Sequence, residues 1–454
     1  MYDLVLKNCN LVNENSSSEV DIAIKNQRIE KIASNIDSGS KEVLDCAGKL
    51  VIPGLIDDQV HFREPGLTHK GEIATESKAA IAGGVTSYFE MPNVNPNTST
   101  IENLNKKFDM ASSRSYANYS FYLGATNENI EEIKKHDPKT SCGLKVFMGA
   151  STGDLLVDKY EALDAIFQHC PTNIVTHCED PKRLIENQEK YKKSHGDSLT
   201  AMHHAVIRDE ECCYLSSSLA VGLAKKYGSN LHVLHLSTAR EMDLFESGPI
   251  ENKNITAEGC VHHLTFSEKD YEELGNFIVC NPSIKTEEDR LGLIEAVKAD
   301  KIDIFATDHA PHTLEEKNQK YTDAPAGIPL VQHSLQMFLE FYFDNIFSIE
   351  TIVEKSSHNV AKRFKIKDRG FIREGYFADI ACVDLDKSYT VKDNILYKCG
   401  WSPLENKTLR SSIFATILNG NIAFQDGKFS DHLHFGQRLE SVSYTHLRAH
   451  ETEA

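Results

Sequence analysis

Residues 51–66 read VIPGLIDDQVHFREPG, and the predicted fold is organised around this stretch. Its apolar run, interrupted by Pro-Gly, is typical of a buried strand. Polar residues follow at the carboxyl end, where parallel α/β folds collect ligands and catalytic groups. Gln59, His61 and Arg63 are spaced two apart, so on a strand their side chains point to one side. An imidazole, a guanidinium and an amide on one side indicate a site for a metal ion and an anion.

The composition restricts the class of protein. The chain has 454 residues and a formal net charge of −18. This length indicates two or three domains, or one barrel with an appendage. The acidic balance, without a basic stripe, argues against nucleic-acid binding. No apolar run approaches the length of a membrane span, the start lacks a signal-peptide pattern, and the eleven cysteines show no CxxC spacing. We therefore expect a cytoplasmic protein with free thiols.

Both ends of the chain alternate apolar and polar residues between turn signals, which is typical of β-hairpins. The stretches with this pattern are 2–52, 370–372, 378–383 and 414–420. We therefore predict one small β-sandwich domain assembled from both termini, residues 1–53 and 367–435. Residues 441–454 are polar and aperiodic and resemble translated vector sequence, which indicates a non-native tail.

The middle of the chain, residues 54–366, alternates strand patterns with amphipathic helical patterns. After the opening strand, the predicted strands are 85–91, 119–123, 144–147, 173–176, 231–234, 255–260 and 302–306. The helical stretches include 77–82, 128–135, 201–226 and 289–299. Eight βα units over this length predict a (β/α)8 barrel of the TIM type. A doubly wound open sheet is the alternative, but the first βα turn has no Gly-rich phosphate loop.

Nearly every predicted barrel strand ends in a residue suited to metal or anion chemistry. Beyond the first strand these residues are Asn93, Lys145, His177, Glu179, His235, Glu258, His262, His263, Asp308 and His312. Singly, such a residue is more often a hydrogen-bonding group or a helix N-cap. Together they occur at matching strand ends, and in a closed barrel these ends meet at one mouth. Only one of the adjacent His262 and His263 can point inward.

Lys145 is unusual because it lies inside an apolar strand pattern, GLKVFMG. A charged amine in a buried strand is costly. The cost disappears if the amine reacts with CO₂ to form an anionic carbamate, which can bridge two metal ions. Imidazole and carboxylate-type ligands favour Zn²⁺, and a pair of such ions can activate water. Asp308, on the last strand, is placed to bind one ion and to transfer a proton.

The ordered motifs HFREPG, MPN, GLKVFM, THCED, LHLST, EGCVHH and ATDHAPH carry a family resemblance. The chain resembles the amidohydrolase superfamily and, within its cyclic amidase branch, the dihydroorotases. The resemblance covers nearly all of residues 1–435, including the β-rich ends. It implies a hydrolase of cyclic amides that acts in pyrimidine biosynthesis.

The resemblance also implies a role for each matching residue. His61 corresponds to a metal ligand on the first strand, Lys145 to a carbamylated bridging lysine, and His177 and His235 to ligands of the second ion. Asp308 corresponds to a metal-binding general base. The residues that correspond to substrate contacts are Arg63, Asn93 and His312 for the carboxylate, and Asn281, Ala326 and Gly327 for the ring.

One position departs from the family pattern. The family has His-x-His on the first strand, whereas this chain has Gln59-Val60-His61. Glutamine offers only a neutral carbonyl oxygen, which is a weaker ligand. Gln59 is therefore a doubtful ligand, and the number of zinc ions, one or two, stays open. His69 is an alternative ligand, but it lies in a loop.

Three functions remain to be separated. The first is a zinc-dependent dihydroorotase, which Arg63 favours because a guanidinium captures a carboxylate in bidentate fashion. Arg63 would lose this role if it paired with Glu64 or Asp58. The second is a hydantoinase- or allantoinase-like cyclic amidase. The third is a catalytically silent scaffold, supported only by Gln59. We also expect a homodimer, with a pyrimidine-pathway enzyme as a candidate partner.

Overall fold

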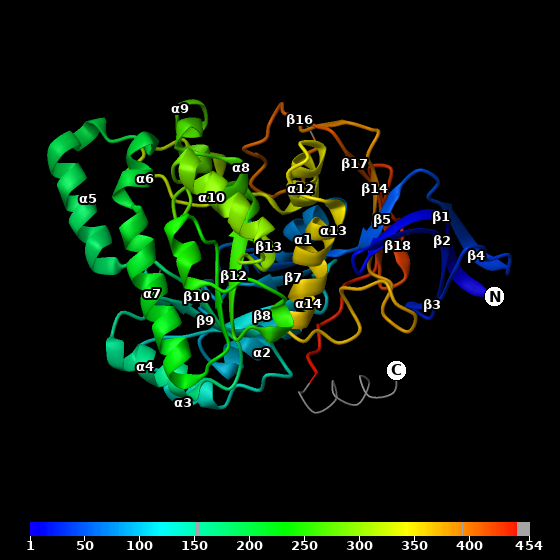
Figure 1. Cartoon of the computed structure of the whole chain (residues 1–454), viewed down its shortest axis with the longest axis horizontal. Coiled ribbons are helices and arrows are strands. Elements are labelled where there is room, and N and C mark those ends of the chain that lie inside the picture. Colours follow the sequence, from blue (N-terminus) through cyan, green and yellow to red (C-terminus); the bar gives the residue numbers. More distant parts are fainter. Residues whose placement is uncertain (150–154, 393, 443–454) are drawn as a thin grey trace.

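Two large β-sheets organise the protein, as Figure 1 shows. The computed structural model describes residues 1–149, 155–392 and 394–442. An eight-stranded sheet with surrounding helices forms the larger part, and a nine-stranded sheet beside it carries the N-terminus. Among the described residues, no helix combines the length and the apolar character needed to cross a bilayer.

The eight-stranded sheet is parallel throughout and follows chain order, as in a TIM-type barrel. Its strands are β6 (Leu55–Val60), β7 (Val85–Glu90), β8 (Asn118–Gly124), β9 (Gly143–Phe147), β10 (Ile174–His177), β11 (Leu231–Val233), β12 (Ile255–Cys260) and β13 (Ile304–Ala306). The seven strands after β6 match the predicted bounds to within two residues at either end. Almost all their residues are buried, because a parallel sheet is covered on both faces. The predicted barrel is confirmed.

The barrel nearly closes between its first and last strands. Val60, at the end of β6, forms a parallel bridge with His309, which follows β13. The His61 backbone N–H donates to the His309 carbonyl over 2.7 Å. This contact brings the first and last predicted site segments side by side, which an open sheet would keep apart. The doubly wound alternative is therefore wrong.

Helices follow most of the barrel strands and surround them. The longer ones are α1 (Ile73–Ala82), α2 (Ile101–Ala111), α4 (Tyr160–His169), α5 (Pro181–His195), α7 (Glu210–Tyr227), α10 (Glu287–Lys298) and α12 (Ser334–Phe343). The short ones are α3 (Ile130–Lys134), α6 (His204–Ile207), α8 (Val261–Thr265), α9 (Tyr271–Leu274), α11 (Leu314–Lys317), α13 (Ile349–Val353) and α14 (Asn359–Arg363).

The continuous helix predicted over residues 201–226 is wrong. The segment contains a 3-10 turn and the short α6, and then breaks at Arg208 and Asp209 before α7. Asp209 has an extended backbone, and its side chain accepts a hydrogen bond from the Cys212 N–H, so it acts as an N-cap. Arg183 holds the same carboxylate at 2.6 Å. Asp209 therefore starts α7 as a separate helix.

The nine-stranded sheet combines both ends of the chain, as predicted. Its strands are β1 (Tyr2–Asn13), β2 (Ser16–Lys25), β3 (Arg28–Ala33), β4 (Ser40–Asp45), β5 (Leu50–Pro53), β14 (Ile380–Asp384), β17 (Ser412–Leu418), β18 (Asn421–Gln425) and β19 (Lys428–Phe429). β5 pairs with β1 from the start of the chain and with β14 from its end. A two-stranded ribbon, β15 (Tyr389–Thr390) and β16 (Thr408–Leu409), is separate.

The predicted boundaries between the two parts stay a prediction. β5 ends at Pro53 in the nine-stranded sheet, and β6 begins at Leu55 in the barrel. Of the predicted tail, Ser441 bridges to Ile366, and residues 443–454 lie outside the described part of the chain.

Apolar side chains fill part of the barrel interior. Phe89 and Tyr122 pack edge-on against Phe364, with ring centroids 4.8 and 6.3 Å apart. All three are buried. These rings belong to one buried apolar cluster, and none of them lines the cavity at the polar strand ends.

Candidate active site

A cavity of about 720 Å³ opens at the carboxyl ends of the barrel strands. All twelve residues predicted for the site line it: Gln59, His61, Arg63, Asn93, Lys145, His177, His235, Asn281, Asp308, His312, Ala326 and Gly327. Three of them, Arg63, His235 and Asp308, have positive φ angles of 71°, 38° and 47°. Non-glycine residues rarely adopt such angles, and they cluster at functional sites.

His61 and Asp308 face each other across the seam of the barrel. His61 Nδ1 lies 2.8 Å from Asn93 Oδ1, and His61 Nε2 lies 3.1 Å from Asp308 Oδ1. An amide oxygen only accepts, so Nδ1 carries the proton and the Nε2 lone pair points at a carboxylate oxygen. Burial lowers the pKa of His61 despite the nearby Asp308 carboxylate, which favours this neutral ring. Two hydrogen-bond acceptors this close together repel each other, and a cation bound between them would remove this repulsion.

Gln59 completes this corner. Its Nε2 donates to Asp308 Oδ1 over 3.0 Å. Its Oε1 is buried and has no hydrogen-bond partner among the described residues. The carbonyl oxygen of Gln59 is therefore free to act as a neutral ligand.

His177 and His235 form a second pair of donor atoms. His177 Nε2 donates to Glu179 at 2.8 Å, which leaves the Nδ1 lone pair 3.1 Å from His235 Nε2. Arg208 also holds the Glu179 carboxylate at 2.8 Å. A carboxylate that fixes the tautomer of a histidine is the usual outer partner of a metal-binding imidazole. The backbone N–H of His235 is held by Glu258 at 2.7 Å.

Lys145 lies on β9 and lines the same cavity as these two pairs, and only 1% of its surface is exposed. Burial lowers the pKa of its amine to about 8, although Asp308 and Glu258 oppose the shift. Within the described parts of the chain, no carboxylate oxygen lies within 4.0 Å of Nζ. At pH 7 about a tenth of the amine is then neutral, far more than in an exposed lysine, and this neutral form is the one that reacts with CO₂.

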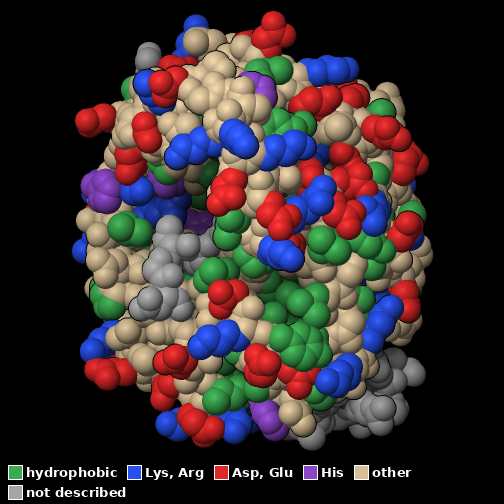
Figure 2. All heavy atoms as spheres, turned by 90° about the vertical axis from the view of Figure 1, so that its left-hand side faces the viewer, with side chains coloured by type: hydrophobic (Ala, Val, Ile, Leu, Met, Phe, Trp, Pro, Cys, Tyr) green, Lys and Arg blue, Asp and Glu red, His purple; other side chains and the backbone are tan. Residues whose placement is uncertain are grey.

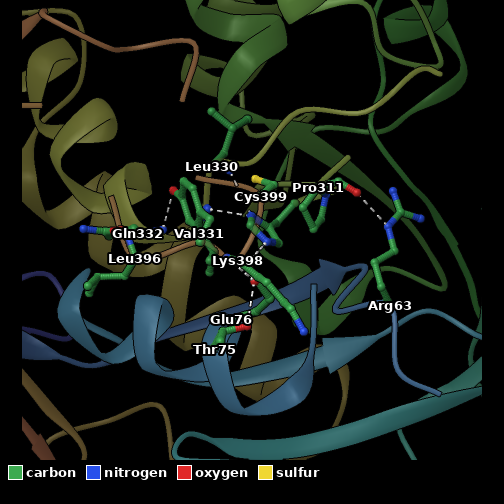
Figure 3. A network of polar contacts seen from close by, with 12 residues as sticks. Arg63, Thr75, Glu76, Pro311, Leu330, Val331, Gln332, Leu396, Lys398 and Cys399 are labelled. Atoms are coloured by element: carbon green, nitrogen blue, oxygen red, sulfur yellow. Dashed lines mark hydrogen bonds and ion pairs between the residues drawn. The ribbon is translucent and has the colours of Figure 1, made fainter. Parts of the chain in front are cut away.

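The opposite wall of the cavity carries cations. Arg63 is buried and donates from Nε to the Pro311 carbonyl over 3.1 Å (Figure 3). Its Nη2 lies 3.0 Å from His312 Nε2. Burial lowers the pKa of Arg63 to about 10, so it stays charged at neutral pH. Lys70, which the sequence did not single out, also lines the cavity and lies 3.1 Å from His312 Nδ1. Burial and these cations depress the pKa of His312, which keeps its ring neutral.

The predicted rival role for Arg63, a structural ion pair, is wrong. Glu64 instead accepts the Ile73 N–H and pairs with Arg114 at 3.1 Å. Asp58 faces His232. Among the described residues, no carboxylate lies within 4.0 Å of the Arg63 guanidinium. A buried guanidinium without an acidic partner, facing a cavity, is suited to an anionic ligand.

A polar network beside the cavity fixes the segment that follows β13. His309 Nδ1 accepts the Leu330 N–H at 3.0 Å, so its Nε2 donates to Glu76 on α1 at 2.9 Å. The other Glu76 oxygen accepts from Thr75 Oγ1 and from the Lys398 N–H, as Figure 3 shows. Asp308 therefore sits on a segment anchored to three distant parts of the chain.

Gly327 is required by the close approach of two segments. Its φ is 148°, and a Cβ atom there would lie 2.4 Å from the Ala310 carbonyl oxygen and 2.9 Å from His312 Nε2. Asn281, on the neighbouring segment, has a buried Oδ1 without a hydrogen-bond partner in the described chain. His263 donates to the adjacent Pro282 carbonyl at 3.0 Å.

Some strand-end candidates do not reach the cavity. His262 and His263 are both buried but do not line it, and the exposed loop residue His69 lies near Glu316 instead. Lys70 carries no sequence signal of its own, because a lysine in a loop is usually solvated. Only the fold places it beside His312.

Comparison with known proteins shows which family the chain belongs to. Residues 50–423 match the amidohydrolase family. An allantoinase of Desulfitobacterium hafniense is 32% identical over 437 residues, covering 94% of this chain and 96% of its own. A dihydroorotase of Methanosphaera stadtmanae is 32% identical over 434 residues, covering 94% and 97%. The L-hydantoinase (dihydropyrimidinase) structure from Arthrobacter aurescens superposes with a TM-score of 0.92 at 26% identity, covering 97% and 100%.

A TIM-type barrel with histidines, acids and a buried lysine at its mouth defines a class of barrel hydrolases. The chain belongs to the amidohydrolase family. The prediction of an enzyme that hydrolyses cyclic amides is confirmed at this level. Allantoinase and dihydroorotase relatives are equally similar, so identity alone does not choose the substrate.

Proposed function

We propose that the protein is a zinc-dependent dihydroorotase. It would interconvert N-carbamoyl-L-aspartate and L-dihydroorotate in the synthesis of pyrimidines. One observation carries the proposal: the buried Arg63 guanidinium faces the cavity without an acidic partner among the described residues, beside Lys70 and His312. Dihydroorotate brings a carboxylate that such a group binds in bidentate fashion. A neutral cyclic amide has no negative charge to pair with the Arg63 guanidinium.

The donor set supports a zinc site. The residues that would hold the ions are His61, Lys145 as its carbamate, His177, His235 and Asp308, with Gln59 Oε1 as a weaker ligand. The lone pairs of His61 and His177 already face other ligand atoms at 3.1 Å, slightly closer than neighbouring ligands on one ion. When bound, zinc supplies Lewis-acid polarisation of the ring carbonyl and makes water more acidic.

The protein's own groups perform the remaining steps. Arg63, Asn93 and His312 hold the carboxylate, which fixes the ring against the strand ends. Asp308 accepts the proton of the attacking water and returns it to the leaving ring nitrogen. Although burial raises it, the pKa of Asp308 lies below its usual value, and Gln59 Nε2 donates a hydrogen bond to its Oδ1 over 3.0 Å. The carboxylate is therefore ionised and ready to accept a proton at neutral pH.

A second candidate is an allantoinase- or hydantoinase-like cyclic amidase. Its support is the 32% identity to an allantoinase, equal to that of the dihydroorotase relative. Both candidates use the same metal and acid groups. They differ in whether the cation wall formed by Arg63 and Lys70 contacts the substrate.

A substrate panel separates the candidates. Purified protein would be assayed with L-dihydroorotate, N-carbamoyl-L-aspartate, allantoin and 5-substituted hydantoins, with zinc measured in the same sample. Turnover of the two carboxylated compounds alone supports the proposal. Turnover of allantoin or hydantoins without dihydroorotate reverses it in favour of the second candidate, and zinc-free, inactive protein would favour the scaffold.

The cellular setting is part of the proposal. A cytoplasmic location fits a pyrimidine enzyme. On the face in Figure 2, acidic and basic side chains are interspersed, which gives nucleic acid no continuous basic track. We expect a homodimer, which sedimentation would test, and a pyrimidine-pathway enzyme as partner, which co-purification would test.

A further inference from the structure

A second group of ligand-type side chains lies inside the barrel. It consists of Asp58 on β6, His232 on β11 and Glu258 on β12. Each of the three is completely buried. None of them lines the mouth cavity. The His232 ring lies 5.9 Å from that of Phe364, which belongs to the buried apolar cluster of the barrel.

Each member of this group presents an unused polar atom to the others. Both carboxylate oxygens of Asp58, Oε2 of Glu258 and Nε2 of His232 have no hydrogen-bond partner among the described residues. Their ligand-type atoms all lie within 4.8 Å of one another. Buried polar atoms are almost always satisfied, so several unsatisfied atoms converging on one point indicate a missing ligand.

The remaining polar atoms of two members are tethered. His232 Nδ1 is hydrogen-bonded to Thr256 Oγ1 at 2.8 Å, which turns Nε2 toward the group. Glu258 Oε1 accepts the backbone N–H of His235 at 2.7 Å, which leaves Oε2 for the group. Outer hydrogen bonds that orient an imidazole and a carboxylate in this way are typical of metal sites.

The spacing fits a small cation. His232 Nε2 lies 3.3 Å from Asp58 Oδ2 and 3.7 Å from Glu258 Oε2. Ligands bound tetrahedrally at about 2.1 Å are separated from one another by roughly 3.4 Å. Two of the three separations are therefore close to the value for ligands of one ion, and the third is at most 4.8 Å.

The charges of this group also favour a bound cation. Within the described part of the chain, no Lys or Arg nitrogen lies within 4.0 Å of the Asp58 or Glu258 carboxylates. Two buried carboxylates beside a single imidazole are costly unless positive charge compensates them. A divalent cation balances both, and a mixed nitrogen and oxygen set suits Zn²⁺.

We infer that Asp58, His232 and Glu258 form a zinc-type cation site inside the barrel, separate from the mouth. The ion would tie β6 to β11 and β12 across the barrel. Because Glu258 accepts the backbone N–H of His235, the internal ion would also help to fix the position of His235 at the mouth. This inference does not depend on which cyclic amide is the substrate.

Zinc stoichiometry tests the inference. The full-length protein would be expressed with added zinc, dialysed, and measured for zinc per chain by mass spectrometry. Asp58→Asn should lose about one zinc per chain relative to the unchanged protein, since it removes a charged ligand. Asp57→Asn is the matched control, because Asp57 is a buried carboxylate on the same strand that bonds Thr307 instead. It should keep the full content.

A mouth variant distinguishes the two sites. His177→Asn should lower the zinc bound at the mouth but retain the internal ion, so a further loss on adding Asp58→Asn supports the inference. Equal zinc content in Asp58→Asn and Asp57→Asn would overturn the inference. The compensating positive charge would then be a proton shared within the group. If Asp58→Asn does not fold, anomalous scattering at the zinc edge from crystals of the unchanged protein decides. A peak between the three side chains supports the site, and its absence overturns it.

Discussion

Replacing Arg63 with methionine gives the most direct test of the substrate proposal. Arg63 has five N–H donors, of which the structure uses one on Pro311 and directs another at His312. Three donors are left for a substrate carboxylate, enough for a bidentate contact. Two charge-assisted hydrogen bonds at about 1.5 kcal/mol each give about 3 kcal/mol, which corresponds to a loss of roughly 10²-fold in kcat/KM.

The loss should appear chiefly as a higher KM for N-carbamoyl-L-aspartate, because the carboxylate is held equally before and during reaction. Initial rates with this compound and with a hydantoin that lacks a carboxylate would be measured on the same preparations. Arg410→Met, at an exposed arginine that pairs with Glu340, is the control for loss of a surface cation. An unchanged KM, or an equal loss on the neutral hydantoin, would refute the carboxylate role of Arg63.

Three further predictions concern other groups. Asp308→Ala should reduce kcat about 10³-fold while zinc is retained in part, because it removes the proton acceptor; a near-normal kcat would exclude that role. Gln59→His should raise the zinc content of the mouth by supplying a stronger ligand, and elemental analysis showing no increase would contradict this. His358 accepts the Glu14 N–H on Nε2 and donates from Nδ1 to the Gly370 carbonyl, and burial lowers its pKa to about 4. Because the unfolded chain takes up this proton below about pH 6.5, stability should fall from there toward pH 4. His358→Gln should remove about 3 kcal/mol of that fall in urea unfolding, and an equally steep fall would count against it.

The sequence was sufficient for the barrel and for most of the mouth. Alternation of buried runs with amphipathic stretches identified the strands, because parallel strands covered on both faces are apolar along their length. The polar residues that end those strands were placed at one mouth by a general property of closed barrels. For this reason Lys145 and Asp308, far apart in the chain, were predicted to line one cavity, as they do.

Tertiary structure alone decided the rest. Strict two-residue alternation along the strand would point the Asp58 side chain away from the barrel interior. The register is irregular between Asp57 and Val60, and Asp58 instead faces His232 inside the barrel. Likewise, only the folded chain brings Arg114 to Glu64, which leaves Arg63 without an acidic partner among the described residues. Only the folded loops bring Lys70 to His312. Local patterns encode which face of a strand is buried. Pairing between distant charged groups depends on how loops and bulges place them, and no local pattern carries that information.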